Sequence, residues 1–376
     1  MADTLKIGKR AILLIHGIGQ QDPFDTIDKF AKGLIELYKR HEVNLEAEHK
    51  VASGYQLANS VNWSGTFLRL RPKDTSEEGI DLFEYYWADK TPGKISFPEV
   101  KDWLKTALDG NIREFKERPE LALLAQGNER KIASRLKEMR RFLRISSLAG
   151  SIVDSLARRF PLAEKLADWL ERRASSVAVR FAGQVAIYTS VDPKSPHYQL
   201  HEEILQGAED LLRTIIADDR YDEIVVAGHS LGSVIAYDTL NRLNVATNFS
   251  GGLPNIKKIK GLATFGSPLD KIILFFSERT QNGQDIRAGI LASLYSFKAR
   301  RFPLRPNQIP VAGIDDRMSS VKWVNYYGQS DLISGDLVMY SGLRNELLNL
   351  PSGLFEAHSA YWTDPIFYDW IGKDFL

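Results

Sequence analysis

The chain has 376 residues, of which 44% are hydrophobic, so it is long enough for one large domain that carries an insertion. Its 49 basic and 48 acidic residues leave a formal net charge of +1, a balance that argues against a nucleic-acid partner. The chain has no cysteine, which excludes disulfides, thiolate nucleophiles and cysteine-bound zinc.

The first predicted element is a buried strand over residues 10–15, an aliphatic run that ends in a His-Gly-Ile-Gly turn at 16–19. This run is too short for a signal peptide or a membrane span, and no later stretch reaches about 18 uncharged residues. We therefore expect a soluble, cytoplasmic protein. A helix over 23–40 and strands over 64–71 and 79–87 follow.

Residues 90–196 have a different character. Apolar side chains recur there at helical spacing almost throughout, as at Ile132 and Leu136. We interpret this segment as an inserted helical domain, which divides the main domain into residues 1–89 and 197–376.

Strands and helices alternate again after the insertion. The pattern predicts a helix over 201–217, a strand over 223–227, a helix over 231–243, and strands over 256–265 and 321–327. Such alternation is typical of an α/β fold with a mostly parallel sheet and helices on both faces.

The strongest chemical signal is the sequence Gly-His-Ser-Leu-Gly at 228–232. An apolar strand precedes it and a helix-forming run follows it, so the small glycines permit a sharp turn that lifts the hydroxyl of Ser230 above the edge of the sheet. This arrangement indicates a nucleophile elbow. The alternative is a turn that only reverses the direction of the chain.

A serine hydroxyl needs a neighbouring imidazole to accept its proton. His229 is adjacent in sequence on a tight turn, so its ring points away from the hydroxyl of Ser230. Among the seven histidines, His358 alone follows Ser230 in the chain, as the order serine, acid, histidine requires. We therefore predict His358 as the general base; a purely structural histidine is the alternative.

The acid that orients the base is expected in a loop after a late strand. Asp331 follows the strand predicted over 321–327 and is our choice. Asp336 and Asp270 remain alternatives, because each also lies near the end of a predicted element.

Acyl transfer also requires amide donors for the developing oxyanion. The amide of Leu231, directly after the nucleophile, is one candidate. The turn at 16–19 offers the second donor, for which we select Ile18.

These motifs, with Phe-Gly-Ser-Pro at 265–268, resemble the lipase and serine-esterase branch of the α/β-hydrolase superfamily. The chain also resembles a less characterised bacterial group that carries Tyr-Tyr-Trp-Ala at 85–88, Trp323 with Asn325, and His358-Ser359 with Tyr361-Trp362. The resemblance covers about residues 10–88 and 201–364. It implies an α/β-hydrolase fold, and we expect the helical insertion, which lies outside the resemblance, to form a lid or cap.

The function expected from these residues is hydrolysis of a carboxylic ester, either a small molecule or a lipid, through an acyl-enzyme on Ser230. Thioester or amide cleavage and acyl transfer would use the same groups. A hydrolase-like protein without turnover, which binds a ligand or associates with a membrane, is the alternative from another class. No cofactor and no metal are expected, and the oligomeric state is left open.

The insertion carries one further signal. Residues 128–160 contain nine basic and three acidic side chains beside apolar residues at helical spacing. Helices of this kind contact anionic membrane surfaces or cover an active site, but helices that simply pack on a core look similar. Peripheral contact with a membrane is therefore one of three open interpretations.

Overall fold

The computed structural model describes most of the chain outside the predicted insertion. Of residues 90–196 it describes only 90–91, 184–185 and 187–188, so the predicted helical domain and its basic segment lie outside the described residues. The described residues are 7–18, 22–51, 65–73, 78–91, 184–185, 187–188, 197–249, 252–272, 296–298, 314–331, 333–338, 340–351 and 356–376.

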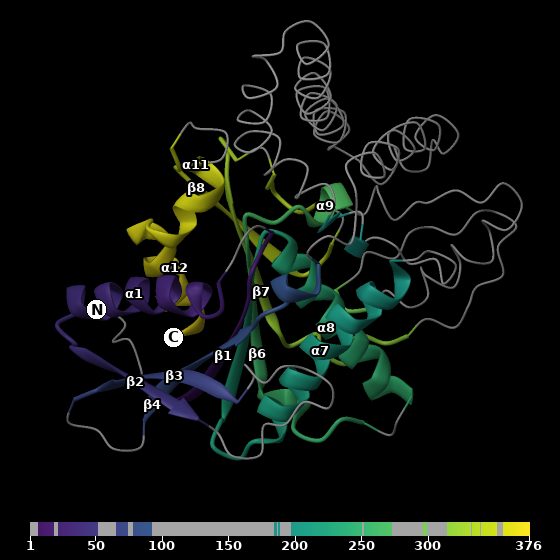
Figure 1. Ribbon diagram of the computed structural model, residues 1–376, viewed down its shortest axis with the longest axis horizontal. Coiled ribbons are helices and arrows are strands. Elements are labelled where there is room, and N and C mark those ends of the chain that lie inside the picture. The colour runs from purple at the N-terminus through teal and green to yellow at the C-terminus, as the bar shows by residue number, and fades with distance from the viewer. Residues whose placement is uncertain are drawn as a thin grey trace, which may run out of the picture.

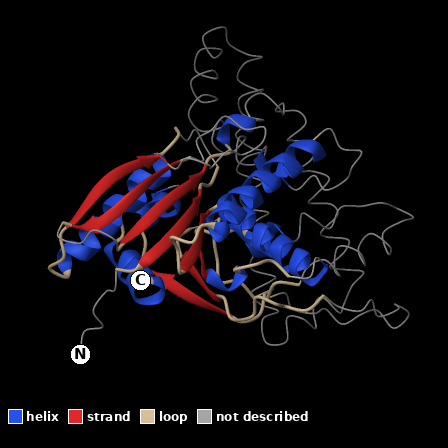
Figure 2. Ribbon diagram, turned by 90° about the horizontal axis from the view of Figure 1, so that it is seen from below, coloured by secondary structure: helices blue, strands red, loops and turns tan. Residues whose placement is uncertain are grey.

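A mixed sheet of eight strands forms the centre of the described structure (Figure 1, Figure 2). The strand order is β2-β3-β4-β1-β5-β6-β7-β8, and β3 runs antiparallel to both of its neighbours, while the other neighbouring pairs are parallel. The strands are β1 (Lys9–Ile15), β2 (Leu45–Val51), β3 (Thr66–Pro72), β4 (Gly79–Tyr85), β5 (Glu223–His229), β6 (Ile259–Phe265), β7 (Lys322–Gly328) and β8 (Leu343–Leu348).

Helices cover both faces of this sheet (Figure 1). Helices α1 (Asp25–Arg40) and α12 (Pro365–Phe375) pack together on one face, and α7 (Tyr198–Ala217) and α8 (Leu231–Phe249) pack together on the other. The predicted α/β class is therefore confirmed. Short helical segments are η1 (Ala88–Lys90), η3 (Ile256–Lys258), α9 (Leu269–Ile272), α11 (Glu356–Ser359) and η4 (Ala360–Trp362).

The central strands are apolar on both sides because both of their faces are buried. In β1, Ala11, Leu13 and Ile15 contact the core beneath α7 and α8, whereas Ile12 and Leu14 contact the core beneath α1 and α12. Successive side chains of a strand point to opposite faces, so one short run supplies both cores. Each fully buried leucine or isoleucine side chain stabilises the fold by about 1.5–3 kcal/mol.

Two described stretches of the predicted insertion, at residues 90–91 and 184–185, lie together. The Gln184 side chain donates a hydrogen bond of 3.0 Å to the hydroxyl of Thr91, so the chain leaves and returns at neighbouring points. Val185 and Tyr188 are buried in the core with α7 and α8. The Tyr188 hydroxyl also donates to the carboxylate of Asp238 on α8, at 2.7 Å.

Two strands were missing from the prediction, β2 and β8, and they form the two edges of the sheet. The strand predicted over 256–265 begins with the single turn η3, so extended structure starts only at Ile259. In the described part of the chain, no helix combines the length and the apolar character needed to cross a membrane.

Candidate active site

Four connections meet at one edge of the sheet, because β1, β5, β6 and β7 are parallel and their carboxyl ends lie side by side. Gly17 follows β1, Ser230 follows β5 and Gly266 follows β6. Asp331 lies in the loop after β7, and His358 reaches this edge from α11. The fold thus gathers side chains that are far apart in the sequence.

Ser230 is the single residue between β5 and α8. Its φ is +53°, in the left-handed region that costs a residue other than glycine on the order of 1–3 kcal/mol. Neighbouring bonds hold it there: its amide donates to the Phe265 carbonyl at 3.0 Å, and its own carbonyl accepts from the Ser233 amide at 3.0 Å. The predicted strand, sharp turn and helix are therefore present.

Two glycines explain why this turn needs small residues. A Cβ atom on Gly232 would lie 2.1 Å from the carbonyl oxygen of Ile15, so α8 begins directly against the end of β1. A Cβ atom on Gly228 would lie 2.5 Å from the carbonyl oxygen of Gly232. The atoms that a Cβ would meet belong to the backbone, which cannot move aside as the end of a flexible side chain can, so both positions require glycine.

A partly buried imidazole and a buried acid lie beside the elbow. The Nδ1 atom of His358 is 2.9 Å from Oδ2 of Asp331, whose side chain has no exposed surface. The Ile333 amide donates to the other carboxylate oxygen at 2.9 Å. Burial by itself would raise the pKa of Asp331, but the adjacent His358 ring and these hydrogen bonds outweigh it and hold the pKa well below its usual range.

Tyr361 is a further member of this group that the sequence analysis named without giving it a role. Its hydroxyl donates to Oδ2 of Asp331 at 3.0 Å and accepts from the Gly328 amide at 3.0 Å. The Ser334 hydroxyl lies 3.1 Å from the phenolic oxygen of Tyr361. Tyr361 is three residues after His358 in a helical stretch, a spacing that indicates that the two side chains lie on the same side.

The structure distinguishes the three candidate acids by position. Asp331 is the one that bonds to His358. Asp270, in α9, accepts a hydrogen bond of 2.8 Å from the Val338 amide. Asp336 is half-buried in the connection between β7 and β8.

Two backbone segments border Ser230 as candidate oxyanion donors. A Cβ atom on Gly17 would lie 2.6 Å from the Cβ atom of Ser230, so the turn that contains Ile18 lies directly against the elbow. Leu231 is the first residue of α8, where amides have no carbonyl partner within their own helix.

The turn after β1 is fixed by a buried histidine. The Nε2 atom of His16 accepts a hydrogen bond of 3.0 Å from the Trp87 amide, so its Nδ1 carries the hydrogen, 2.7 Å from the Gly17 carbonyl. The Trp87 indole stacks on this ring and donates to the His16 carbonyl at 3.0 Å. Burial lowers the pKa of His16 to about 4, which keeps the ring neutral.

The hydroxyl of Ser230 is buried, and among the described residues nothing hydrogen-bonds to its Oγ. His358 lies beside the turn after β6, since a Cβ atom on Gly266 would lie 3.1 Å from its Cε1 atom. Ser230 bonds to Phe265, the residue before that glycine. The structure thus joins His358 to Asp331 and places both His358 and Ser230 beside the same turn. Hydrogen bonds to a general base often tighten only when substrate binds.

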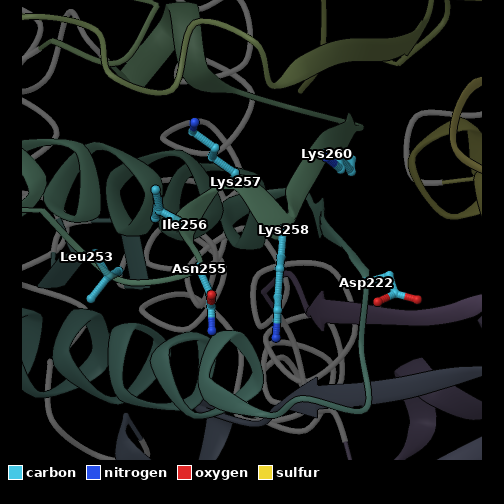
Figure 3. Close-up of a pocket in the computed structure, with 7 residues that line it drawn as sticks. All are labelled: Asp222, Leu253, Asn255, Ile256, Lys257, Lys258 and Lys260. Atoms are coloured by element: carbon cyan, nitrogen blue, oxygen red, sulfur yellow. The ribbon is translucent and has the colours of Figure 1, made fainter.

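A surface cavity of about 400 Å³ lies at the amino ends of the strands, away from Ser230, around η3 and the start of β6 (Figure 3). Three lysines line it but point in different directions, and Lys258 caps α7 by donating to the Ile216 and Asp218 carbonyls at 3.2 and 2.9 Å. Its lysines therefore do not converge on one ligand. In the described ranges no three histidine, aspartate or glutamate side chains are grouped so that they could hold a metal ion.

Comparisons of the sequence with protein families and curated proteins give no relative from which a function could be transferred. No protein-family model matches the chain, and no curated protein matches its sequence. The geometry at the carboxyl edge of the sheet is therefore the ground on which a function can be assigned.

Proposed function

We propose that the chain is a serine hydrolase with the α/β-hydrolase fold that cleaves carboxylic esters through an acyl-enzyme on Ser230. The observation that carries this proposal is the placement of Ser230, with positive φ, between β5 and α8 and beside the hydrogen-bonded pair of His358 and buried Asp331. A bare serine between glycines would be weak support. Its combination with an acid-bound imidazole at the same edge is the arrangement that serine activation requires.

Each member of the triad has a role that follows from its contacts. The Nδ1–H of His358 donates to Asp331, which leaves Nε2 free of hydrogen to accept the proton of the Ser230 hydroxyl. As that proton moves, Oγ forms a bond to the carbonyl carbon of the ester. The carboxylate of Asp331 stabilises the imidazolium that results, and its depressed pKa keeps it ionised at neutral pH.

Collapse of the tetrahedral intermediate breaks the bond to the alkoxy oxygen, which takes the proton from His358 and leaves as an alcohol. Water then attacks the acyl group on Ser230, with His358 accepting its proton and returning one to Oγ. The products are a carboxylic acid and an alcohol, and the free enzyme is restored.

The negative oxygen of both intermediates needs donors that are already in place. The amide of Leu231 is suited to this role because it opens α8, whose N-terminus carries partial positive charge. The amide of Ile18 is the second proposed donor, supported by the close approach of Gly17 to Ser230 and by the bonds that His16 makes to that turn.

The sheet adds support for the finer fold assignment. Seven of its strands share one direction, and the nucleophile, acid and base occur in the chain order that this fold uses. The elbow also lies at the carboxyl ends of the strands, where open α/β sheets bind their ligands.

The test is reaction with a fluorophosphonate, which needs an activated serine together with an oxyanion hole. We expect one adduct per chain, on Ser230, and no adduct on Ser230→Ala. Ser320→Ala is the matched control, because Ser320 is exposed and distant in sequence from the elbow. Labelling of Ser230→Ala at the wild-type rate, or no labelling of the wild type, would contradict the proposal.

A further inference from the structure

His229, which the proposed mechanism does not use, lies at the centre of the site. It is the last residue of β5, and its ring is buried on the side of the sheet that α12 covers, against Phe265, Tyr361 and Trp362. The ring centroids of His229 and His358 are 4.8 Å apart. The residue beside the nucleophile therefore also borders the base.

His229 fills the space between three connections. Its Nε2 atom lies 2.9 Å from the main-chain carbonyl oxygen of His358. A Cβ atom on Gly17 would lie 3.1 Å from its Nδ1 atom, and one on Gly266 would lie 3.2 Å from its Nε2 atom. A carbonyl only accepts, so Nε2 carries the hydrogen and donates.

The base needs such an anchor. His358 belongs to α11, a single turn of four residues. The bond from Nδ1 to Asp331 fixes one edge of its ring but leaves the ring able to pivot about that contact. A second bond, at its main-chain carbonyl, fixes the point from which the side chain starts.

We propose that His229 is a positioning residue, whose Nε2–H holds the main-chain carbonyl of His358 and so aims the His358 ring at Ser230; this inference rests on the proposed function of the site. In this role His229 neither transfers a proton nor forms a bond to the substrate. It connects the end of the strand that carries the nucleophile directly to the turn that carries the base, so that the two move together.

The neutrality of His229 supports this role. Burial, together with the neighbouring His358, lowers the pKa of its ring to about 3. His229 thus stays neutral beside the ring that accepts the serine proton. The proton taken from Ser230 stays on His358, where Asp331 can stabilise it, and does not pass to His229.

The test compares three replacements of His229. In His229→Gln the amide group reaches about as far as Nε2, whereas in His229→Asn it is one methylene too short, and His229→Phe keeps the ring without a donor. Each variant is assayed for kcat and KM on a soluble nitrophenyl ester and for its fluorophosphonate labelling rate. His201→Phe is the matched control, because it removes another buried histidine, on α7 and outside the site.

We expect His229→Phe and His229→Asn to lower kcat and the labelling rate by about 10- to 100-fold with little change in KM, the loss typical of a misplaced catalytic group. His229→Gln should recover most of that loss, and His201→Phe should keep wild-type kcat. Wild-type rates in both His229→Asn and His229→Phe would overturn the inference. Equal loss in His229→Gln and His229→Asn would also overturn it.

These results separate the two proposals. Failure of the wild type to label at Ser230 contradicts the proposed function. Labelling of the wild type at Ser230 together with wild-type rates in the His229 variants contradicts only the positioning role. If His229→Phe does not fold, the comparison of His229→Gln with His229→Asn still decides, since both carry the same amide group.

Discussion

Tyr361 donates its phenolic hydrogen to Oδ2 of Asp331 at 3.0 Å, the same oxygen that lies 2.9 Å from Nδ1 of His358. One carboxylate oxygen therefore serves both the proposed base and a buried phenol. This shared contact fixes the orientation of the carboxylate and connects the proposed triad to the amide of Gly328.

Tyr361→Phe tests that contact. It removes a donor to Asp331 and leaves the buried Gly328 amide without its phenolic acceptor, which we expect to lower the free energy of unfolding by about 1–3 kcal/mol. We also expect a loss in kcat of about tenfold with little change in KM. Tyr368→Phe is the control: it removes a buried hydroxyl that lies within hydrogen-bond distance of the main-chain carbonyls of Lys29 and Trp362. Urea unfolding and ester kinetics measure both effects, and equal kcat in the two variants would contradict the account.

Asp331→Asn tests the choice of acid. The amide group of asparagine can donate to Nδ1, which places the ring hydrogen on Nε2 and so favours the wrong imidazole tautomer, with an expected fall in kcat of about 10⁴-fold. Asp270→Asn and Asp336→Asn should have mild effects. Steady-state kinetics of the three variants decide the matter: near-wild-type kcat in Asp331→Asn, with a large loss in either other variant, would show that the acid is misassigned.

Gly17→Ala tests the contact between the turn after β1 and the elbow. The new methyl would lie 2.6 Å from the Cβ atom of Ser230, so one of the two segments must shift. We expect at least about a tenfold loss of kcat, since small displacements of catalytic groups are costly. Gly8→Ala is the matched control, because a Cβ atom there meets nothing within 4 Å. If Gly17→Ala and Gly8→Ala hydrolyse the ester equally fast, the turn plays no part in the site.

Asp238 provides a prediction on stability. Burial raises its pKa to about 7, and the hydroxyl of Tyr188 only partly offsets this. The unfolded chain ionises this group near its ordinary pKa of about 4, so the folded state binds the extra proton between about pH 4 and 7. Its contribution to stability is therefore lost as the pH rises through this window.

Asp238→Asn cannot ionise, so its free energy of unfolding relative to wild type should increase between pH 4 and 8, by up to a few kcal/mol. The measurement is urea unfolding of both proteins at several pH values. A difference between them that stays constant across this range would contradict the raised pKa.

The sequence predicted the centre of the fold better than its edges, for a physical reason. Strands β1 and β5 are covered on both faces, so they appear in the sequence as uninterrupted aliphatic runs. Strands β2 and β8 lie at the edges and carry charged residues on partly exposed faces, as edge strands usually do. Their formation depends on pairing with β3 and β7, which local composition does not encode.

The same distinction holds at the site. The turn at Ser230 could be predicted because its glycines and flanks are adjacent in the sequence. Chain order selected His358, but it left Asp270 and Asp336 as alternatives to Asp331. The bonds made by His229 and Tyr361 could not be predicted. They join residues 129 and 30 positions apart, and only the folded sheet brings these residues together.

The central claim is that Ser230 is the nucleophile, and the most direct measurement is ester turnover by purified wild type and Ser230→Ala side by side, with intact-protein mass taken during turnover. The account predicts that wild type hydrolyses a nitrophenyl ester and gains the mass of one acyl group, located on Ser230. It predicts that Ser230→Ala gains none and retains at most about one thousandth of the rate. Undiminished turnover by Ser230→Ala, or acylation of the wild type at another residue, would contradict it.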